Sequence, residues 1–81
     1  MLLRVVQNRS RLEIYLDVLK IVKKGTHEST RIMYKANLSW KPMIKTLDSL
    51  IEQGLIYKEV DGKHVTYHIT ENGRNILGYL E

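Results

Sequence analysis

The chain has 81 residues, a formal net charge of +4 and no cysteine. Its length fits one domain with a modest hydrophobic core, and the lack of cysteine excludes a disulfide framework and a thiolate metal site. The basic excess favours a polyanionic partner such as a nucleic acid, the alternative being a merely soluble basic protein. The opening MLLRVV is too short, and too soon followed by Arg9 and Arg11, for a signal peptide or a membrane span, so we expect a soluble cytoplasmic protein.

Residues 1–10 are the least readable stretch of the chain. Their pattern fits a short strand followed by a linker, and two roles stay open. One is a flexible arm without contacts. The other is an arm that pairs with a partner subunit or touches phosphate through Arg4, Arg9 and Arg11. We place the folded domain after this arm, over residues 11–81.

Residues 11–24 predict a helix with a wide apolar arc. Its polar positions occupy a narrow wedge, and apolar residues fill more than half of the circumference. That is roughly twice the 100° stripe that a surface helix needs. Ile14 and Ile21 lie at the edge of the arc, so we expect another molecule to cover them. Gly25 ends this helix.

Residues 30–36 predict a second helix, which is followed by a tight turn. Ile32 and Ala36 point inward in this helix, together with Met33. The turn contains Leu38, which we expect to be buried between two helices. Ser39 is the predicted N-cap of the next helix, because serine side chains accept hydrogen bonds from backbone amides at that position.

Residues 40–53 predict an amphipathic third helix, which Gly54 ends. Its apolar face holds Met43, Ile44, Leu47, Leu50 and Ile51. Its polar face holds Lys41, Pro42, Lys45, Ser49 and Glu52, with Thr46 beside them. Trp40 falls on the core side by angle, which favours a packing role over base stacking. Two lysines on the polar face suit a helix laid into a DNA groove.

After Gly54 the apolar residues alternate with a period of two, which predicts a hairpin. Asp61-Gly62 is a preferred dipeptide for a two-residue turn. Pairing across that turn sets Val60 opposite Lys63, Lys58 opposite Val65, and Ile56 opposite Tyr67. The tip of this wing carries Lys63 and His64. Thr70 then caps a final helix over residues 71–80.

The order of these elements defines an α+β winged helix-turn-helix, with a three-helix core, a two-stranded β wing and a short C-terminal helix. The run TRIMYKANLS, an amphipathic helix, GLI, a hairpin and ITENG resembles the small archaeal winged helix-turn-helix proteins. The resemblance covers residues 12–80. That family includes regulators and abundant dimeric chromatin-type proteins, so the resemblance implies DNA binding and a dimer whose contact lies near the C-terminal end.

The expected function is duplex DNA binding as a transcription regulator or chromatin-associated protein of the nucleoid. The helix of residues 40–53 would enter the major groove, Arg31 and Lys35 would hold phosphates beside it, and the wing tip would reach a neighbouring backbone or minor groove. The predicted contact residues are Arg31, Lys35, Ser39, Lys41, Lys45, Thr46, Ser49, Lys63 and His64. The alternative is a protein-interaction adaptor, which would place aromatic or aliphatic anchors on that helix face.

The sequence offers little for catalysis or ligand binding. His64 and His68 share a strand face about 13 Å apart, and no carboxylate is placed to complete a metal site with them. There is no glycine-rich phosphate loop and no nucleophile–base pair at a recognisable spacing. We therefore expect no enzyme activity, no metal, no cofactor and no small-molecule ligand.

We also expect a homodimer, held by the first and last helices and not by a long coiled coil. Gly73 and Gly78 each weaken the last helix by roughly 1 kcal/mol relative to alanine, so this helix should depend on packing. Gly78 would let another backbone come close. The predicted interface residues are Ile14, Ile21, Ile76, Leu77 and Leu80. A monomer covered by its own N-terminal segment is the competing arrangement.

Overall fold

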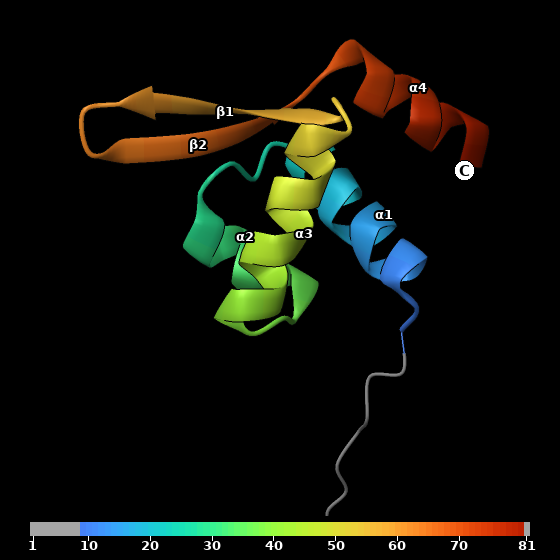
Figure 1. The fold of residues 1–81 in the computed structure, drawn as a ribbon, viewed down its shortest axis with the longest axis horizontal. Coiled ribbons are helices and arrows are strands. Elements are labelled where there is room, and N and C mark those ends of the chain that lie inside the picture. Colours follow the sequence, from blue (N-terminus) through green and yellow to red (C-terminus); the bar gives the residue numbers. More distant parts are fainter. Residues whose placement is uncertain (1–8, 81) are drawn as a thin grey trace, which may run out of the picture.

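The computed structural model describes residues 9–80, which form four helices and a two-stranded antiparallel sheet (Figure 1). The elements in chain order are α1 (Arg11–Lys23), α2 (Ser29–Ala36), α3 (Trp40–Glu52), β1 (Ile56–Asp61), β2 (His64–Ile69) and α4 (Glu71–Leu80). This architecture confirms the predicted winged helix-turn-helix. The predicted roles of residues 1–8 lie outside the described residues.

The ends of the helices follow from local chemistry. The Ser10 hydroxyl accepts a hydrogen bond from the Glu13 amide, and the Glu13 carboxylate accepts one from the Ser10 amide, which is a capping box. Asn37, with φ 56°, ends α2 in the left-handed conformation, and Gly54, with φ 74°, does so after α3. Ser39 occupies the predicted N-cap position of α3, but its side chain makes no capping hydrogen bond.

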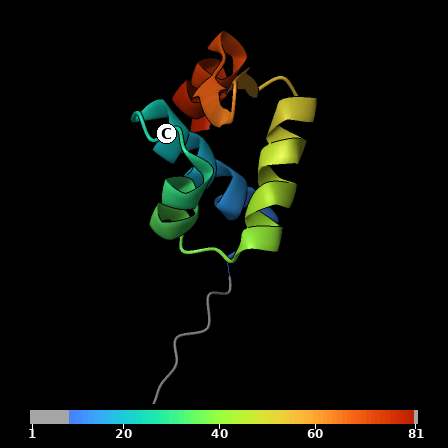
Figure 2. The ribbon, with the colours of Figure 1, turned by 90° about the vertical axis from the view of Figure 1, so that its left-hand side faces the viewer.

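The hydrophobic core lies where α1, α2, α3, the hairpin and α4 meet. Figure 2 shows α2 and α3 standing on two sides, with α1 behind them and the sheet and α4 above. The buried apolar side chains are Val18, Leu19, Val22, Ile32, Ala36, Met43, Leu47, Leu50, Ile56, Tyr67 and Leu77. Leu38 packs against this cluster, as predicted. The wing projects from one end of the molecule and α4 lies at the other (Figure 1).

The predicted register of the hairpin is wrong by two residues. The strands pair Ile56 with Ile69, Lys58 with Tyr67 and Val60 with Val65, and the turn residues are Gly62 and Lys63. Gly62 has φ 61°, and glycine at the first turn position is typical of a type II′ hairpin. A two-residue shift leaves each side chain on the same face of the sheet, and Ile56, Tyr67 and Ile69 pack against the helices. The turn, with Gly62 at its first position, therefore fixes the register.

Arg9 ties the start of α1 to the turn between α2 and α3. Its guanidinium pairs with Asp17 at 2.9 Å and donates hydrogen bonds to the carbonyl oxygens of Ala36 at 2.8 Å and Asn37 at 3.3 Å. These contacts argue against the alternative in which Arg9 touches phosphate. Among the described arginines predicted to touch phosphate, Arg11 makes no contact of this kind with the rest of the chain.

Candidate nucleic-acid interface

The exposed face of α3 separates its charges along the helix axis. Lys41 and Lys45 are exposed in the N-terminal half, whereas Asp48 and Glu52 are exposed in the C-terminal half. A negatively charged partner is therefore attracted to the first turns of α3 and repelled from the last. The N-terminal half of a recognition helix is also the part that contacts base edges in helix-turn-helix proteins.

The helix is rotated about its axis relative to the predicted orientation. Thr46 is 5% exposed, and its hydroxyl donates a hydrogen bond to the Pro42 carbonyl at 2.8 Å. The prediction that Thr46 faces a partner is therefore wrong. Trp40, predicted to pack inward, is 49% exposed. Ile44 and Ile51 are half-buried at the edge of the core and not at its centre.

A cleft with a positive rim runs between the start of α1 and the first turns of α3. Its volume is about 680 Å³. The lining residues are Arg11, Ile14, Tyr15, Lys41, Pro42, Lys45, Thr46 and Ser49. Three of these residues are cations and none is a carboxylate. We call this the α1–α3 cleft, and its charge suits an anionic group such as a phosphate.

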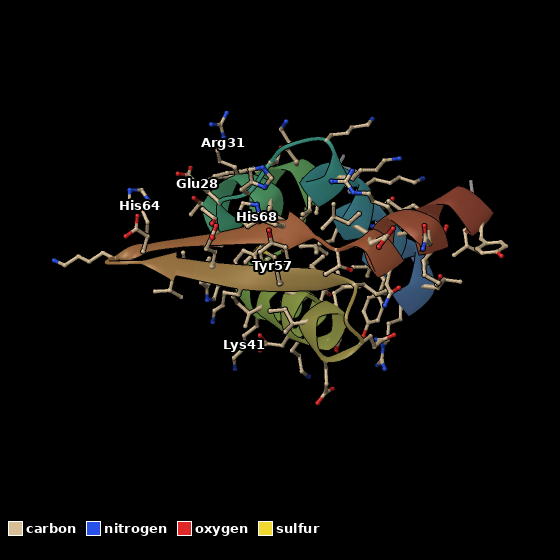
Figure 3. The ribbon with its side chains drawn as sticks, turned by 90° about the horizontal axis from the view of Figure 1, so that it is seen from above. Glu28, Arg31, Lys41, Tyr57, His64 and His68 are labelled. Atoms are coloured by element: carbon tan, nitrogen blue, oxygen red, sulfur yellow. The ribbon has the colours of Figure 1, made fainter. Side chains whose placement is uncertain are left out.

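The remaining predicted cations form a second group. Arg31 and Lys35 are exposed on α2 and line a different cleft, of about 460 Å³, together with Lys24 and Glu28. Figure 3 shows Arg31 and Lys41 on opposite sides of the wing when the molecule is seen from above. The cations predicted to share one surface therefore fall into two groups, one on α2 and one on α3.

The wing tip carries the predicted Lys63 and His64, and both side chains are exposed. Asp61 pairs with His64 across the strands and is also exposed. Its carboxylate offsets part of the positive charge at the tip. The wing therefore adds a weaker positive potential than the α1–α3 cleft does.

A histidine cluster joins the wing to the body of the protein, and sequence reasoning missed it. The His27 and His68 rings lie 4.4 Å apart, and Tyr57 stacks on His68 at 5.2 Å. His68 Nε2 lies 2.8 Å from the Thr66 hydroxyl and 3.3 Å from a Glu59 carboxylate oxygen. Residues 27 and 68 are too distant in sequence for a spacing argument to connect them. Within residues 9–80, no group of three or more potential ligands is placed to bind a metal.

His27 also contacts Tyr67 of β2, through its backbone carbonyl and through its imidazole ring. The Tyr67 amide donates to the His27 carbonyl at 2.9 Å, and His27 Nδ1 lies 2.8 Å from the Tyr67 carbonyl. The Tyr67 ring is part of the core. Burial, together with the negative charge of Asp48, raises the pKa of the Tyr67 phenol above its usual value of 10.0. The neutral phenol is therefore the form that the fold favours.

The predicted dimer residues differ in how far the structure buries them. Leu77 is 0% exposed and belongs to the core of its own chain, so its prediction as an interface residue is wrong. Ile14 and Ile21 are half-buried and pack against the same core, which removes the need for another molecule to cover them. Ile76 and Leu80 remain exposed on α4.

The exposed apolar surface at this end includes two residues that the sequence did not single out. Tyr79 of α4 is 88% exposed, and Leu12 of α1 is also exposed. We call Leu12, Ile76, Tyr79 and Leu80 the α1/α4 apolar surface. Helix α4, which carries three of these residues, lies at the end of the molecule opposite the wing tip (Figure 1). Across residues 9–80, no helix has the length and apolar content that crossing a membrane requires.

Comparison with known proteins identifies archaeal relatives. The chain is 38% identical over 72 residues to an uncharacterized protein of Methanocaldococcus jannaschii, covering 89% of this chain and 70% of the relative. A second uncharacterized protein of that organism is 34% identical, but the chain spans only 33% of its length.

The fold is similar to that of known DNA-binding proteins. Sso10a-2, a DNA-binding protein from Sulfolobus solfataricus, superposes with a TM-score of 0.80 at 26% identity, over 89% of this chain and 75% of that protein. A MarR family transcriptional regulator from Silicibacter pomeroyi has the same fold, with a TM-score of 0.77 at 22% identity. The superposition covers 88% of this chain and 49% of the regulator. A family model described as winged helix-turn-helix matches residues 8–81. The chain therefore belongs to the winged helix-turn-helix family.

Proposed function

We propose that the protein binds duplex DNA as a transcription regulator or chromatin-associated protein. The observation that carries this proposal is the α1–α3 cleft, where Arg11, Lys41 and Lys45 meet without a carboxylate beside the first turns of α3. The similar fold of the DNA-binding Sulfolobus protein supports it. Phosphates supply most of the affinity of such interfaces, because bound cations release counterions from DNA.

In this proposal, the first turns of α3 lie in the major groove. Lys41 and Lys45 face base edges or adjacent phosphates, with Ser39 and Ser49 at the borders of that surface. Arg11 holds a phosphate at the α1–α3 cleft. Lysine and serine read bases less well than arginine, asparagine or glutamine, so these contacts give affinity with little sequence preference.

The wing and α2 would add contacts on either side. Lys63 and His64 at the wing tip reach a neighbouring backbone or minor groove in this proposal. Arg31 and Lys35 hold phosphates beside α2. Because Arg31 lies across the wing from Lys41 (Figure 3), we expect the α2 group to contribute less than the α3 group in a complex with straight DNA.

The salt dependence of DNA binding tests the proposal. Each neutralised phosphate contributes about −0.9 to the slope of log Kobs against log salt. The three cations of the α1–α3 cleft alone give a slope near −3, and the wing makes it steeper. Fluorescence anisotropy of a labelled duplex, titrated at several salt concentrations, measures this slope. Absence of binding at low salt, or binding that salt does not change, would count against the proposal.

An adaptor role is the second candidate, and one observation favours it. The exposed Trp40 and the half-buried Ile44 give α3 the kind of apolar anchors that protein partners use. The lysines between them oppose this role, because charged residues are depleted at the centre of protein interfaces. Retention on a DNA resin, with elution at rising salt, separates the two candidates.

We further propose that the protein is a homodimer joined through the α1/α4 apolar surface. Leu12, Ile76, Tyr79 and Leu80 are exposed there, and α4, which carries three of them, lies at the other end of the molecule from the wing tip (Figure 1). Two-fold symmetry would then separate the two groove helices by about 34 Å, one turn of DNA. Sedimentation equilibrium at micromolar concentration tests this, and a single 9.5 kDa species would contradict it.

A further inference from the structure

Trp40 and Ile44 form an apolar row along the first turns of α3. They are four residues apart, so their side chains are neighbours on the helix surface. Trp40 is half-exposed and Ile44 is half-buried, in contrast to the fully buried Met43 and Leu47 on the next face. The core therefore does not account for the position of the indole, and this row is available to a partner.

The lysine row lies directly beside the apolar row. Trp40, Lys41, Ile44 and Lys45 together line a shallow cleft of about 450 Å³ that contains no carboxylate. A partner that fills this cleft has to present apolar groups and negative charge close together, because the two rows are adjacent on α3. Apolar protein anchors supply the first feature without the second.

The major groove of duplex DNA presents both features. Phosphates border it, and the C5 methyl group of thymine is its apolar element. We propose that Trp40 and Ile44 contact thymine methyl groups, so that the protein prefers A·T base pairs at positions that its lysines do not discriminate. This inference rests on the proposed binding of duplex DNA.

The test compares duplexes that differ only in methyl groups. An alternating A·T duplex is matched with the same duplex in which deoxyuridine replaces thymidine, so that the phosphates are unchanged. Burying one methyl group changes an affinity by about fourfold, and we expect wild-type protein to bind the thymine duplex about fourfold more tightly for each methyl contacted. Methylation of C5 of cytosine in a G·C duplex should raise its affinity in the same way.

Two variants assign the preference to this row. Trp40→Ala should reduce the preference for the thymine duplex, since only Ile44 then contacts a methyl group, and it should keep the salt slope of the wild type because the lysines are unchanged. Arg74→Ala, which changes an exposed side chain of α4 outside the proposed dimer surface, should keep the thymine preference. Trp40 is the only tryptophan, so its fluorescence should also shift when the thymine duplex binds.

The outcomes separate this inference from the proposed function. Equal wild-type affinity for the thymine and deoxyuridine duplexes overturns the methyl contact and leaves DNA binding intact. A preference that Trp40→Ala retains in full also overturns it. Failure to bind any duplex at low salt removes the proposed function itself. The comparison on wild-type protein needs no variant, so its result does not depend on whether Trp40→Ala folds.

Discussion

Replacement of Gly73 by alanine tests how α4 is fixed to the body of the protein. Gly73 is buried near the start of α4. A Cβ atom there would overlap the Leu55 carbonyl oxygen and would lie 2.7 Å from Cγ1 of Ile69. That carbonyl also accepts a hydrogen bond from the Thr70 amide at 3.1 Å. The backbone at Leu55 therefore cannot withdraw without losing this bond, so Gly73→Ala should destabilise the fold.

The expected magnitude combines opposing effects. Alanine in place of glycine inside a helix gains about 1 kcal/mol. Overpacking costs about 1–3 kcal/mol, and loss of the Thr70 to Leu55 hydrogen bond costs about 0.5–1.5 kcal/mol. The sum is a net loss of roughly 0.5–3.5 kcal/mol in the free energy of unfolding. In a domain of this size, each 1 kcal/mol lowers Tm by about 4–8 °C.

Gly78 is the matched control in the same helix. A Cβ atom at Gly78 has nothing within 4 Å, so Gly78→Ala should gain about 1 kcal/mol from helix propensity alone. Thermal unfolding followed by circular dichroism, at one protein concentration, measures both variants. A Gly73→Ala protein as stable as the wild type, or a shift equal in sign to that of Gly78→Ala, would refute this account of α4 docking.

Three further predictions concern binding, assembly and pH. Lys45→Ala should make the salt slope of DNA binding shallower by about 1, whereas Arg74→Ala, on α4 at the other end, should leave the slope unchanged. Equal losses of affinity for the two variants in an anisotropy titration would indicate that binding depends on overall charge and not on this surface. Leu80→Asp should give a folded monomer in sedimentation equilibrium, whereas Leu77→Asp should unfold the chain because Leu77 is in the core; a folded dimer of Leu80→Asp would contradict the interface. Burial, and to a smaller extent the charge of Asp48, raises the pKa of the Tyr67 phenol in the folded protein. The unfolded chain therefore releases the phenol proton at a lower pH than the folded protein does, and stability should fall as pH rises above about 10. Tyr67→Phe should lose less stability than the wild type in alkaline unfolding titrations, and an unchanged loss would refute the role of this phenol.

The fold could be predicted because its signals are local. Asn37, Gly54 and Thr70 each mark the end of an element by chemistry that involves a few neighbouring residues, and the observed boundaries lie within one residue of the predicted ones at these positions. The family match confirms the predicted winged helix-turn-helix and agrees with the prediction that the protein is not an enzyme.

The candidate site was harder to predict because it depends on helix rotation. Angular counting weights all apolar residues of α3 equally, so it placed Ile44 and Ile51 on the buried face together with Met43, Leu47 and Leu50. In the structure α3 rests on α1 and β1, and this contact centres the buried face on Met43 and Leu50. The rotation buries Thr46. It also exposes Trp40, which changes the apolar character of the proposed DNA surface.

The apolar arc of α1 shows why an oligomeric state is hard to infer from one helix. The arc is wide because α2, α3, β2 and α4 all pack on α1 within the same chain. Ile14 and Ile21 are covered by these neighbours. The width of an apolar arc therefore indicates how many elements surround a helix and not whether a second molecule is present. The case for a dimer depends instead on side chains that remain exposed after all of these contacts are made, and Tyr79 of α4 is the largest of those in the α1/α4 apolar surface.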